Sequence, residues 1–515
     1  MRHRDQLSAI SYRLSAISYQ LSAIGYRPAP VASGISTSLT GIIVAMLLCV
    51  GAPARLSAQV TAPPVLGAPK PFHMPKVQTT RLANGLTIDL VEMHKLPLVN
   101  IQFMIDGGAR LDGDLPGLAT FTADMLDEGA GTRDAIGIAA EAAYLGADLN
   151  TGADWDHTTV SLQVPTRTLP AALDLMADVV LRPHFHTADV DKHRGLRMAD
   201  ILQRRDVPAA VASLVSNALI FPAGHPYHVS TSGDSASTVR LDSTQVRRFY
   251  DRIDDPRRAT VVVTGDITLA QARALLARRF GGWKVHTGDA NSAAAAPTPA
   301  PVSRPTTLYL VDKPGAAQSV VVIGAPGVPR STPDYYALEV MNTILGGSFS
   351  SRLNQDLRET KGYTYGAGSR FQFRPIPGPF TASAAVRTNV TDSSLTDFFV
   401  QLHAIRDSLV QPVELTRATQ YLALGLPGDF ETTGQVARQL SGLLLFGLPF
   451  SYYNGFVANL HRVTRQDVQR VARRYIDPDH LTVVVVGDLA KIRAPIEALH
   501  LGPVVVVDAD GKAVP

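Results

Sequence analysis

The sequence has 515 residues, of which 45% are hydrophobic and 18% are charged, as is typical of a globular protein with two or three domains. The formal net charge is only +3 and no long run of Lys or Arg occurs, so nucleic-acid binding has no support from composition. The single cysteine, Cys49, excludes a fold held together by disulfides within the chain.

The first 58 residues combine a short repeat with a segment typical of export signals. Leu-Ser-Ala-Ile recurs at 7, 14 and 21, as a marginal coiled coil or as translated upstream sequence, and we attach no function to it. Residues 41–50 are apolar, too few to span a membrane but right for the core of a signal peptide with cleavage before Gln59. We therefore expect 1–58 to hold the repeat and a signal peptide, and the protein to be exported, to the periplasm; a buried N-terminal helix is the alternative.

The first half of the remaining chain, residues 76–286, alternates predicted strands and helices. In chain order we expect strands at 85–92 and 98–106, helices at 117–126 and 136–145, a strand at 158–164 and an amphipathic helix at 169–180. Strands interleaved with helices in this order predict an α+β domain, in which helices cover one face of a mainly antiparallel sheet.

The second half repeats features of the first. A Pro- and Ala-rich segment, 287–305, predicts a linker, which 306–490 follows as a second domain and 491–515 as a C-terminal tail. Residues 246–266 and 468–488 both read as a helix, Asp-Pro, a β-branched strand and Gly-Asp. This repetition indicates duplication of one domain, with chance similarity of two strand-turn units as the alternative.

A resemblance to a known family begins at residues 116–126, which read Pro-Gly-Leu-Ala-Thr-Phe-Thr-Ala-Asp-Met-Leu. The segment resembles the active-site helix of the pitrilysin/insulinase family of zinc peptidases, where the same positions read P-G-x-A-H-x-x-E-H-M-L. In the family, both histidines bind zinc from one helix face, and the glutamate is the general base for the zinc-bound water. Here those three positions hold Thr120, Ala123 and Asp124, which leaves the helix without metal ligands and base.

The family's third zinc ligand is a glutamate, and by spacing its position falls on Asp200. Two carboxylates without an imidazole differ from ordinary catalytic zinc sites, so we expect no metal in this chain. Asp124 and Asp200 are then polar helix residues, with a weak hard-cation site as the alternative. His184, His186 and His193 lack the helical spacing of a metal pair, and we expect structural roles for them.

The resemblance extends from about residue 76 to 490 and implies two homologous domains that form half of a clam-shell. Residues 346–370 are similar to the second-domain segment in which an arginine and a tyrosine seven residues later face the zinc across a closed chamber. By position these are Arg358 and Tyr365, which the resemblance implies to be the catalytic residues of this chain. Their chemistry fits, because a guanidinium and a phenol can both donate hydrogen bonds to the oxyanion that amide hydrolysis creates.

The resemblance therefore implies a non-catalytic subunit of a heterodimeric zinc peptidase. Its partner would be a homologous subunit that carries the zinc, and its substrate a peptide or unfolded protein, with Arg358 and Tyr365 supplied in trans. A scaffold resembling the core subunits of respiratory complexes is one alternative. Another is a pseudopeptidase that holds extended peptides by strand addition at an edge strand from Asn150 onward.

Overall fold

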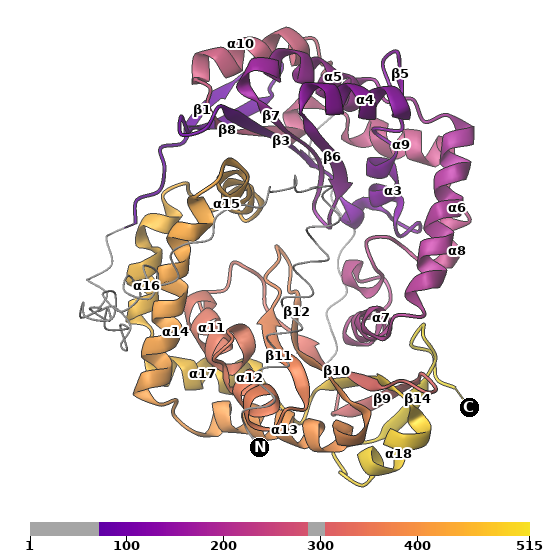
Figure 1. Ribbon diagram of the computed structural model, residues 1–515, viewed down its shortest axis with the longest axis vertical. Coiled ribbons are helices and arrows are strands. Elements are labelled where there is room, and N and C mark those ends of the chain that lie inside the picture. The colour runs from indigo at the N-terminus through magenta and orange to yellow at the C-terminus, as the bar shows by residue number, and fades with distance from the viewer. Residues whose placement is uncertain (1–71, 287–303, 515) are drawn as a thin grey trace, which may run out of the picture. The chain divides into compact units, whose positions relative to one another are not determined.

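The computed structural model describes residues 72–286 and 304–514, all within one compact unit, Lys70–Pro515. Each half of this unit forms a six-stranded sheet with its own helices, which confirms the predicted α+β class (Figure 1). The predicted repeat and signal peptide, and most of the predicted linker, lie outside the described residues.

The sheet of the first domain has the order β1-β2-β8-β3-β7-β6, and every neighbouring pair is antiparallel except β2 and β8. Its strands are β1 (Gln78–Arg81), β2 (Thr87–Glu92), β3 (Leu98–Asp106), β6 (Asp148–Ala153), β7 (His157–Pro165) and β8 (Ala259–Gly265). Strand β6 is an edge strand of this sheet. A short hairpin, β4 (Gly129–Ala130) and β5 (Arg133–Asp134), lies outside it.

The sheet of the second domain has the order β11-β12-β10-β13-β9-β14, with parallel pairing only between β13, β9 and β14. Its strands are β9 (Thr307–Asp312), β10 (Gln318–Pro326), β11 (Thr364–Phe371), β12 (Pro379–Arg387), β13 (Thr482–Gly487) and β14 (Val504–Val507). Strand β11, which carries Tyr365, is the edge strand equivalent to β6.

The repeated Gly-Asp sequences end the central strand of each sheet. Strand β8 lies between β2 and β3, and β13 occupies the matching place between β9 and β10. A Cβ on Gly265, whose φ is +137°, would lie 2.2 Å from the carbonyl oxygen of Leu98, and one on Gly487 would lie 2.6 Å from Oγ of Ser319. Both positions therefore need glycine because a neighbouring strand crosses there.

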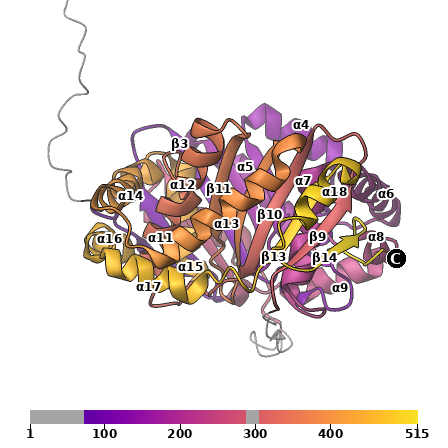
Figure 2. The same cartoon turned by 90° about the horizontal axis from the view of Figure 1, so that it is seen from below.

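One face of each sheet packs against helices of the same domain. Figure 2 shows α11, α13 and α18 lying in front of the strands of the second sheet. The helices of the first domain are α3 (Leu118–Asp124), α4 (Ala135–Leu145), α5 (Leu169–Leu181), α6 (Thr187–Arg204), α7 (Pro208–Ile220), α8 (Ser235–Thr238), α9 (Ser243–Ile253) and α10 (Leu269–Phe280). Those of the second are α11 (Tyr335–Asn342), α12 (Arg352–Asn354), α13 (Thr391–Asp407), α14 (Pro412–Gly425), α15 (Thr433–Leu445), α16 (Phe456–Arg462), α17 (Arg465–Tyr475) and α18 (Leu489–Glu497).

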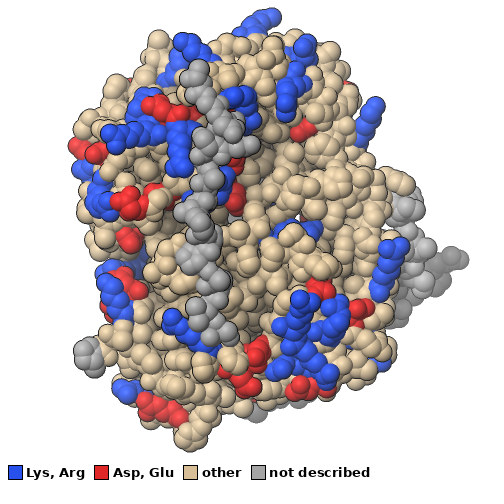
Figure 3. Space-filling view, turned by 180° about the vertical axis from the view of Figure 1, so that it is seen from behind, with Lys and Arg blue, Asp and Glu red and all other residues tan. Residues whose placement is uncertain are grey.

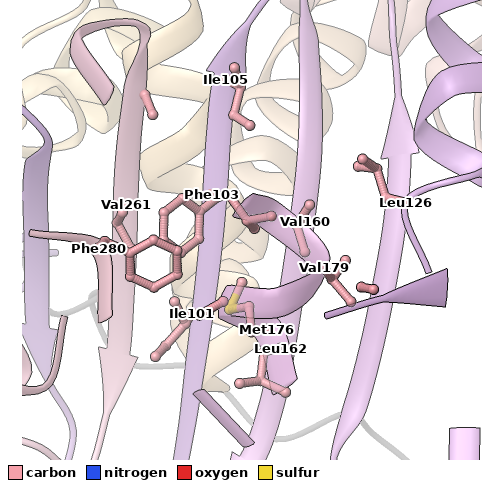
Figure 4. Close-up of a cluster of buried hydrophobic side chains, with 14 of the residues drawn as sticks. Ile101, Phe103, Ile105, Leu126, Val160, Leu162, Met176, Val179, Val261 and Phe280 are labelled. Carbon is pink, nitrogen blue, oxygen red and sulfur yellow. The ribbon is translucent and has the colours of Figure 1, made fainter. Parts of the chain in front are cut away.

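Alternation along the strands builds the core of the first domain. Ile101 and Phe103 of β3 point to the helices together with Val261 of β8, and all three are almost fully buried (Figure 4). Phe280 of α10 lies against Phe103, with the ring centroids 4.5 Å apart. Strand β3 coincides with the strand predicted at 98–106, and its alternate side chains face the core.

The opposite face of each sheet is partly covered by a helix from the other domain, which the sequence did not predict. Helix α15 packs on β8 and β3, where Val436 and Leu440 join a buried cluster with Val262. Helix α7 packs on β13 and β10, where Val215 joins Val484. Figure 1 shows α15 beside the strands of the first domain. The two domains thus exchange equivalent helices, because the middle of each sheet is apolar on both faces.

The C-terminal residues form part of the second domain, so the predicted tail at 491–515 is wrong for most of its length. Helix α18 begins at Leu489, and β14 adds a parallel strand beside β9. The run of four valines at 504–507 provides the apolar side chains that this edge of the sheet buries in part.

Two further observations concern the surface and the helices. Basic and acidic side chains are interspersed on the face drawn in Figure 3, as the small net charge suggests. Among the described helices, none is both long enough and apolar enough to cross a membrane.

Candidate functional site

At both ends of the 116–126 segment, the residues that match the family pattern serve packing. Gly117 has φ +95°, and a Cβ there would lie 2.8 Å from the carbonyl oxygen of Ser232, so the adjoining chain requires glycine. At the other end, Met125 and Leu126 are 1% and 3% exposed within the core of the first domain. The residues shared with the family thus keep helix α3 in place independently of any metal.

The positions of the two lost histidines are joined by an arginine from helix α6. Nη1 of Arg197 donates to Oγ1 of Thr120 over 3.1 Å, and Nη2 lies 2.5 Å from Oδ2 of Asp124. The hydroxyl of Thr120 in turn donates to the carbonyl oxygen of Thr231 over 2.8 Å. The guanidinium also lies 5.0 Å from the ring centroid of Phe121, and only 8% of the Arg197 side chain is exposed. A fixed cation therefore lies where the family would hold its metal.

The carboxylate of Asp200, at the position of the third zinc ligand, is likewise paired with an arginine. Arg204 forms an ion pair with Asp200, and its Nη1 donates to Oγ of Ser232 over 2.6 Å. Hydrogen bonds from Arg204 hold the pKa of Asp200 below its usual range. The hollow beside these residues has a volume of about 350 Å³. Asp124 and Asp200, the two carboxylates beside this hollow, therefore each have a guanidinium partner.

These residues do not fit zinc. Ala123 is fully buried and has no donor atom, and the two carboxylates are engaged by arginines. Burial lowers the pKa of Arg197, but a guanidinium remains a cation at any physiological pH. Among the described residues, no group of three His, Cys, Asp or Glu side chains is placed to hold a metal ion. These residues therefore do not form the zinc site that peptide hydrolysis requires in the family.

Helix α3 is also fixed by a buried carboxylate. The two oxygens of Asp112 accept from the backbone N–H groups of Gly117 and Ala119 over 2.7 and 2.8 Å. Burial raises the pKa of Asp112 to about 7, against the effect of these two bonds and of the Arg197 charge. The interaction caps the first turn of the helix.

The histidines near this site have structural partners. Nε2 of His184 lies 2.9 Å from the carbonyl oxygen of Gly131, and Nε2 of His193 lies 2.7 Å from Oε1 of Glu128. The ring of His186 lies tilted against that of His184, with the ring centroids 5.0 Å apart, just before α6 begins. These contacts account for the three residues without a metal.

Arg358 lies in an unusual helical segment of the second domain. Residues Gln355–Thr360 form a π-helix, η6, and a second π-helix, η5, spans Thr343–Gly347. Such turns are rare and are found frequently at functional sites. The Arg358 side chain is 39% exposed, and its guanidinium lies 4.6 Å from the ring centroid of Phe349. Within the part of the chain that the structure describes, its one ion pair is with the adjacent Glu359, at 3.3 Å. The ring therefore supports the guanidinium from one side and leaves donors free for another group.

Tyr365 lies at an irregularity of strand β11. The pairing with β12 shifts register between Thr364 and Ala367, which places Tyr365 and Gly366 in a bulge. The Tyr365 side chain is 90% exposed. A bulge commonly redirects a side chain from the regular pattern, and here it holds a large aromatic group in solvent. The ring and the hydroxyl of Tyr365 are therefore accessible to a ligand or partner.

Asn354 connects the two elements that carry this pair. Its side chain is buried, donates to the carbonyl oxygen of Phe349 over 2.7 Å and accepts from the N–H of Ala367 over 3.3 Å. In addition, a Cβ on Gly346 would lie 2.2 Å from the N atom of Ser369, so η5 packs directly on β11. The backbones before Arg358 and after Tyr365 are thereby held together.

The structure places the predicted residues in two separate groups, one around Thr120, Asp124 and Asp200 and one around Arg358 and Tyr365. Within the described residues, no hydrogen bond links Arg358 to Tyr365. Sequence reasoning missed Arg197, Phe349 and Asn354. Arg197 had one available signal, since it lies three residues before Asp200 on the same predicted helix and so on nearly the same face.

Comparison of the sequence with known proteins finds matches to one peptidase family. The family model described as "Insulinase (Peptidase family M16)" matches residues 90–220, and the one described as "Peptidase M16 inactive domain" matches 240–422. An uncharacterized zinc protease of Mycobacterium leprae is 29% identical over 307 residues, which cover 59% of this chain and 68% of that protein. A protein of Helicobacter pylori named a non-peptidase homolog is 22% identical over 405 residues, covering 78% and 91%.

A solved structure supports the same relationship. A peptidase M16 inactive domain from Pseudomonas fluorescens superimposes with a TM-score of 0.73 at 26% identity, over 80% of this chain and 98% of that one. Together the two family models cover more than half of the 515 residues. The chain therefore belongs to the insulinase, or M16, peptidase family, as a non-catalytic member whose first domain lacks the zinc ligands.

Proposed function

We propose that this chain is the non-catalytic subunit of a two-subunit zinc peptidase. It binds the peptide and stabilises the oxyanion at the zinc site of a homologous partner, through Arg358 and Tyr365. The observation that carries the proposal is the contrast between its two sites. Arg197 fills the first site, whereas Arg358 and Tyr365 are held at a π-helix and a bulge with their polar groups exposed.

The chemistry of the pair suits this role. A guanidinium and a phenol can each donate a hydrogen bond to a carbonyl oxygen, and these bonds strengthen as negative charge develops on it. Asn354 and the ring of Phe349 restrict the two groups before substrate arrives, which lowers the cost of ordering them during reaction. Export is part of the same proposal, on the strength of the apolar segment at 41–50.

The test is kinetic and uses the complex of this chain with a homologous chain that has an intact His-x-x-Glu-His motif. We expect Arg358→Ala to lower kcat/KM for a peptide about 100-fold, the usual effect of removing one oxyanion donor, and Tyr365→Phe to lower it about 10-fold or more. The zinc content of the complex should not change, because neither residue belongs to the partner's ligand set.

Two variants serve as matched controls. Tyr421→Phe removes a hydroxyl from another exposed tyrosine, and Arg278→Ala removes another exposed guanidinium; both should leave kcat/KM unchanged. If the Arg358→Ala and Tyr365→Phe complexes assemble and cleave peptides at the normal rate, the chain is a scaffold and the proposal is wrong.

A further inference from the structure

The face of the second sheet that α7 covers leaves an open hollow beside that helix. Strands β11 and β12 form its floor, and Ser213 and Asn217 of α7 form part of its wall. Its volume is about 500 Å³, enough for several side chains of a peptide. Gly366, the residue after Tyr365, belongs to its lining, so the hollow lies next to one member of the proposed catalytic pair along β11.

The charged group in the lining of the hollow is a cation, the guanidinium of Arg370. Among the described residues, no Asp or Glu lines it, and Arg370 is the only ionisable side chain in its lining. The exposed guanidinium of Arg370 has neither a hydrogen bond nor an ion pair to any residue in the described ranges. The other polar groups nearby, such as Ser383 and Gln372, are neutral. An anionic group is therefore the complementary occupant.

Strand β11 sets the distance between Tyr365 and Arg370. Arg370 follows Tyr365 by five residues along β11, which corresponds to about 15–17 Å at about 3.3 Å per residue. A peptide in extended conformation has the same rise, so a peptide that passes Tyr365 and follows the strand reaches Arg370 about four to six residues away.

We propose that this hollow is a specificity subsite that binds an acidic side chain of the substrate peptide, four to six residues from the bond at Tyr365, with Arg370 as its counter-ion. The proposal rests on the function proposed above for its peptide substrate. It adds a selectivity for side chains, since the role proposed for the catalytic pair concerns the carbonyl oxygen of the main chain.

The experiment compares fluorescein-labelled peptides that carry Asp or Asn at each position from three to seven residues on either side of a fixed cleavable bond. With the unchanged chain alone, we expect the best Asp peptide to bind about five to ten times more tightly than its Asn counterpart in anisotropy titrations. In the complex with the zinc-bearing subunit, the same preference should appear in KM, with kcat unchanged.

Arg370→Glu should reverse the preference, so that a peptide with Lys at that position binds best. The matched control is Arg387→Glu, which makes the same charge change at an exposed arginine of β12 outside the lining of the hollow and should leave the preference intact. An Asp preference that survives Arg370→Glu, or the absence of any Asp preference in the unchanged chain, overturns the subsite.

The two proposals fail in different ways. If the subsite alone is wrong, Arg358→Ala still lowers kcat/KM while Arg370→Glu changes no preference. If the proposed peptidase role alone is wrong, Arg370 still selects acidic peptides in titrations of the isolated chain, while no partner-dependent cleavage responds to Arg358→Ala.

Discussion

Restoring the three lost zinc ligands should not restore zinc binding while Arg197 is present. We expect the variant Thr120→His, Asp124→His, Asp200→Glu to hold less than about 0.1 zinc per chain, because the guanidinium lies against both helix positions. A unit charge and a zinc ion about 4 Å apart repel by about 8 kcal/mol at an effective dielectric constant of about 20. This loss corresponds to about six orders of magnitude in affinity.

Adding Arg197→Gln to the same three changes should raise the zinc content to near one per chain. The measurement is metal analysis after dialysis against a weak chelator, with circular dichroism to confirm folding. Arg205→Gln is the matched control, since Arg205 follows the same helix and pairs with Asp510 away from the site. Stoichiometric zinc in the three-ligand variant with Arg197 still present would show that the arginine does not replace the metal.

Leu440→Ala is the substitution for which we expect the largest loss of stability. The side chain is fully buried between α15 and the first sheet, in the cluster that contains Val262 and Met104. Truncating such a leucine leaves a cavity and costs about 2–5 kcal/mol. The exposed Leu424 of α14 provides the control, because Leu424→Ala removes little buried area and should change stability by no more than about 0.5 kcal/mol.

The place of Leu440 makes this test informative about cooperativity as well. It belongs to the second domain but packs on the first, so its loss should lower the hydrogen-exchange protection of β8 and β13 together. Chemical denaturation should show one transition at a lower midpoint. Two separate transitions, with protection lost only around β8, would mean that the domains unfold independently.

The sequence predicted what depends on local pattern. The strand predicted at 98–106 is β3, and the amphipathic helix predicted at 169–180 is α5 to within one residue. Each of these features is encoded within ten to twenty neighbouring residues, where periodicity is informative. The family assignment is confirmed for the same reason, since many local landmarks occur in order.

The features that the sequence did not predict depend on tertiary contacts. The ion pair between Arg197 and Asp124 joins residues 73 positions apart, on two helices whose relative placement no periodicity encodes. The bulge at Tyr365 and the buried bond from Asn354 arise where β11 meets the π-helices. The valines at 504–507 join the sheet by pairing with β9, a contact nearly 200 residues away in sequence, and the predicted tail is therefore wrong there.

The position of β8 and β13 in the centre of their sheets has a consequence for how the chain acquires its structure. In the first domain, β2 and β3 are synthesised early, but the strand that joins them is completed only at Gly265, about 160 residues later. Contacts of such long sequence separation form slowly, because a large loop must close before the pairing stabilises it. The second domain repeats this order, with β13 ending at Gly487. Each half therefore emerges from the ribosome with two apolar strands that lack their common neighbour, and its sheet can close only after that neighbour has been made.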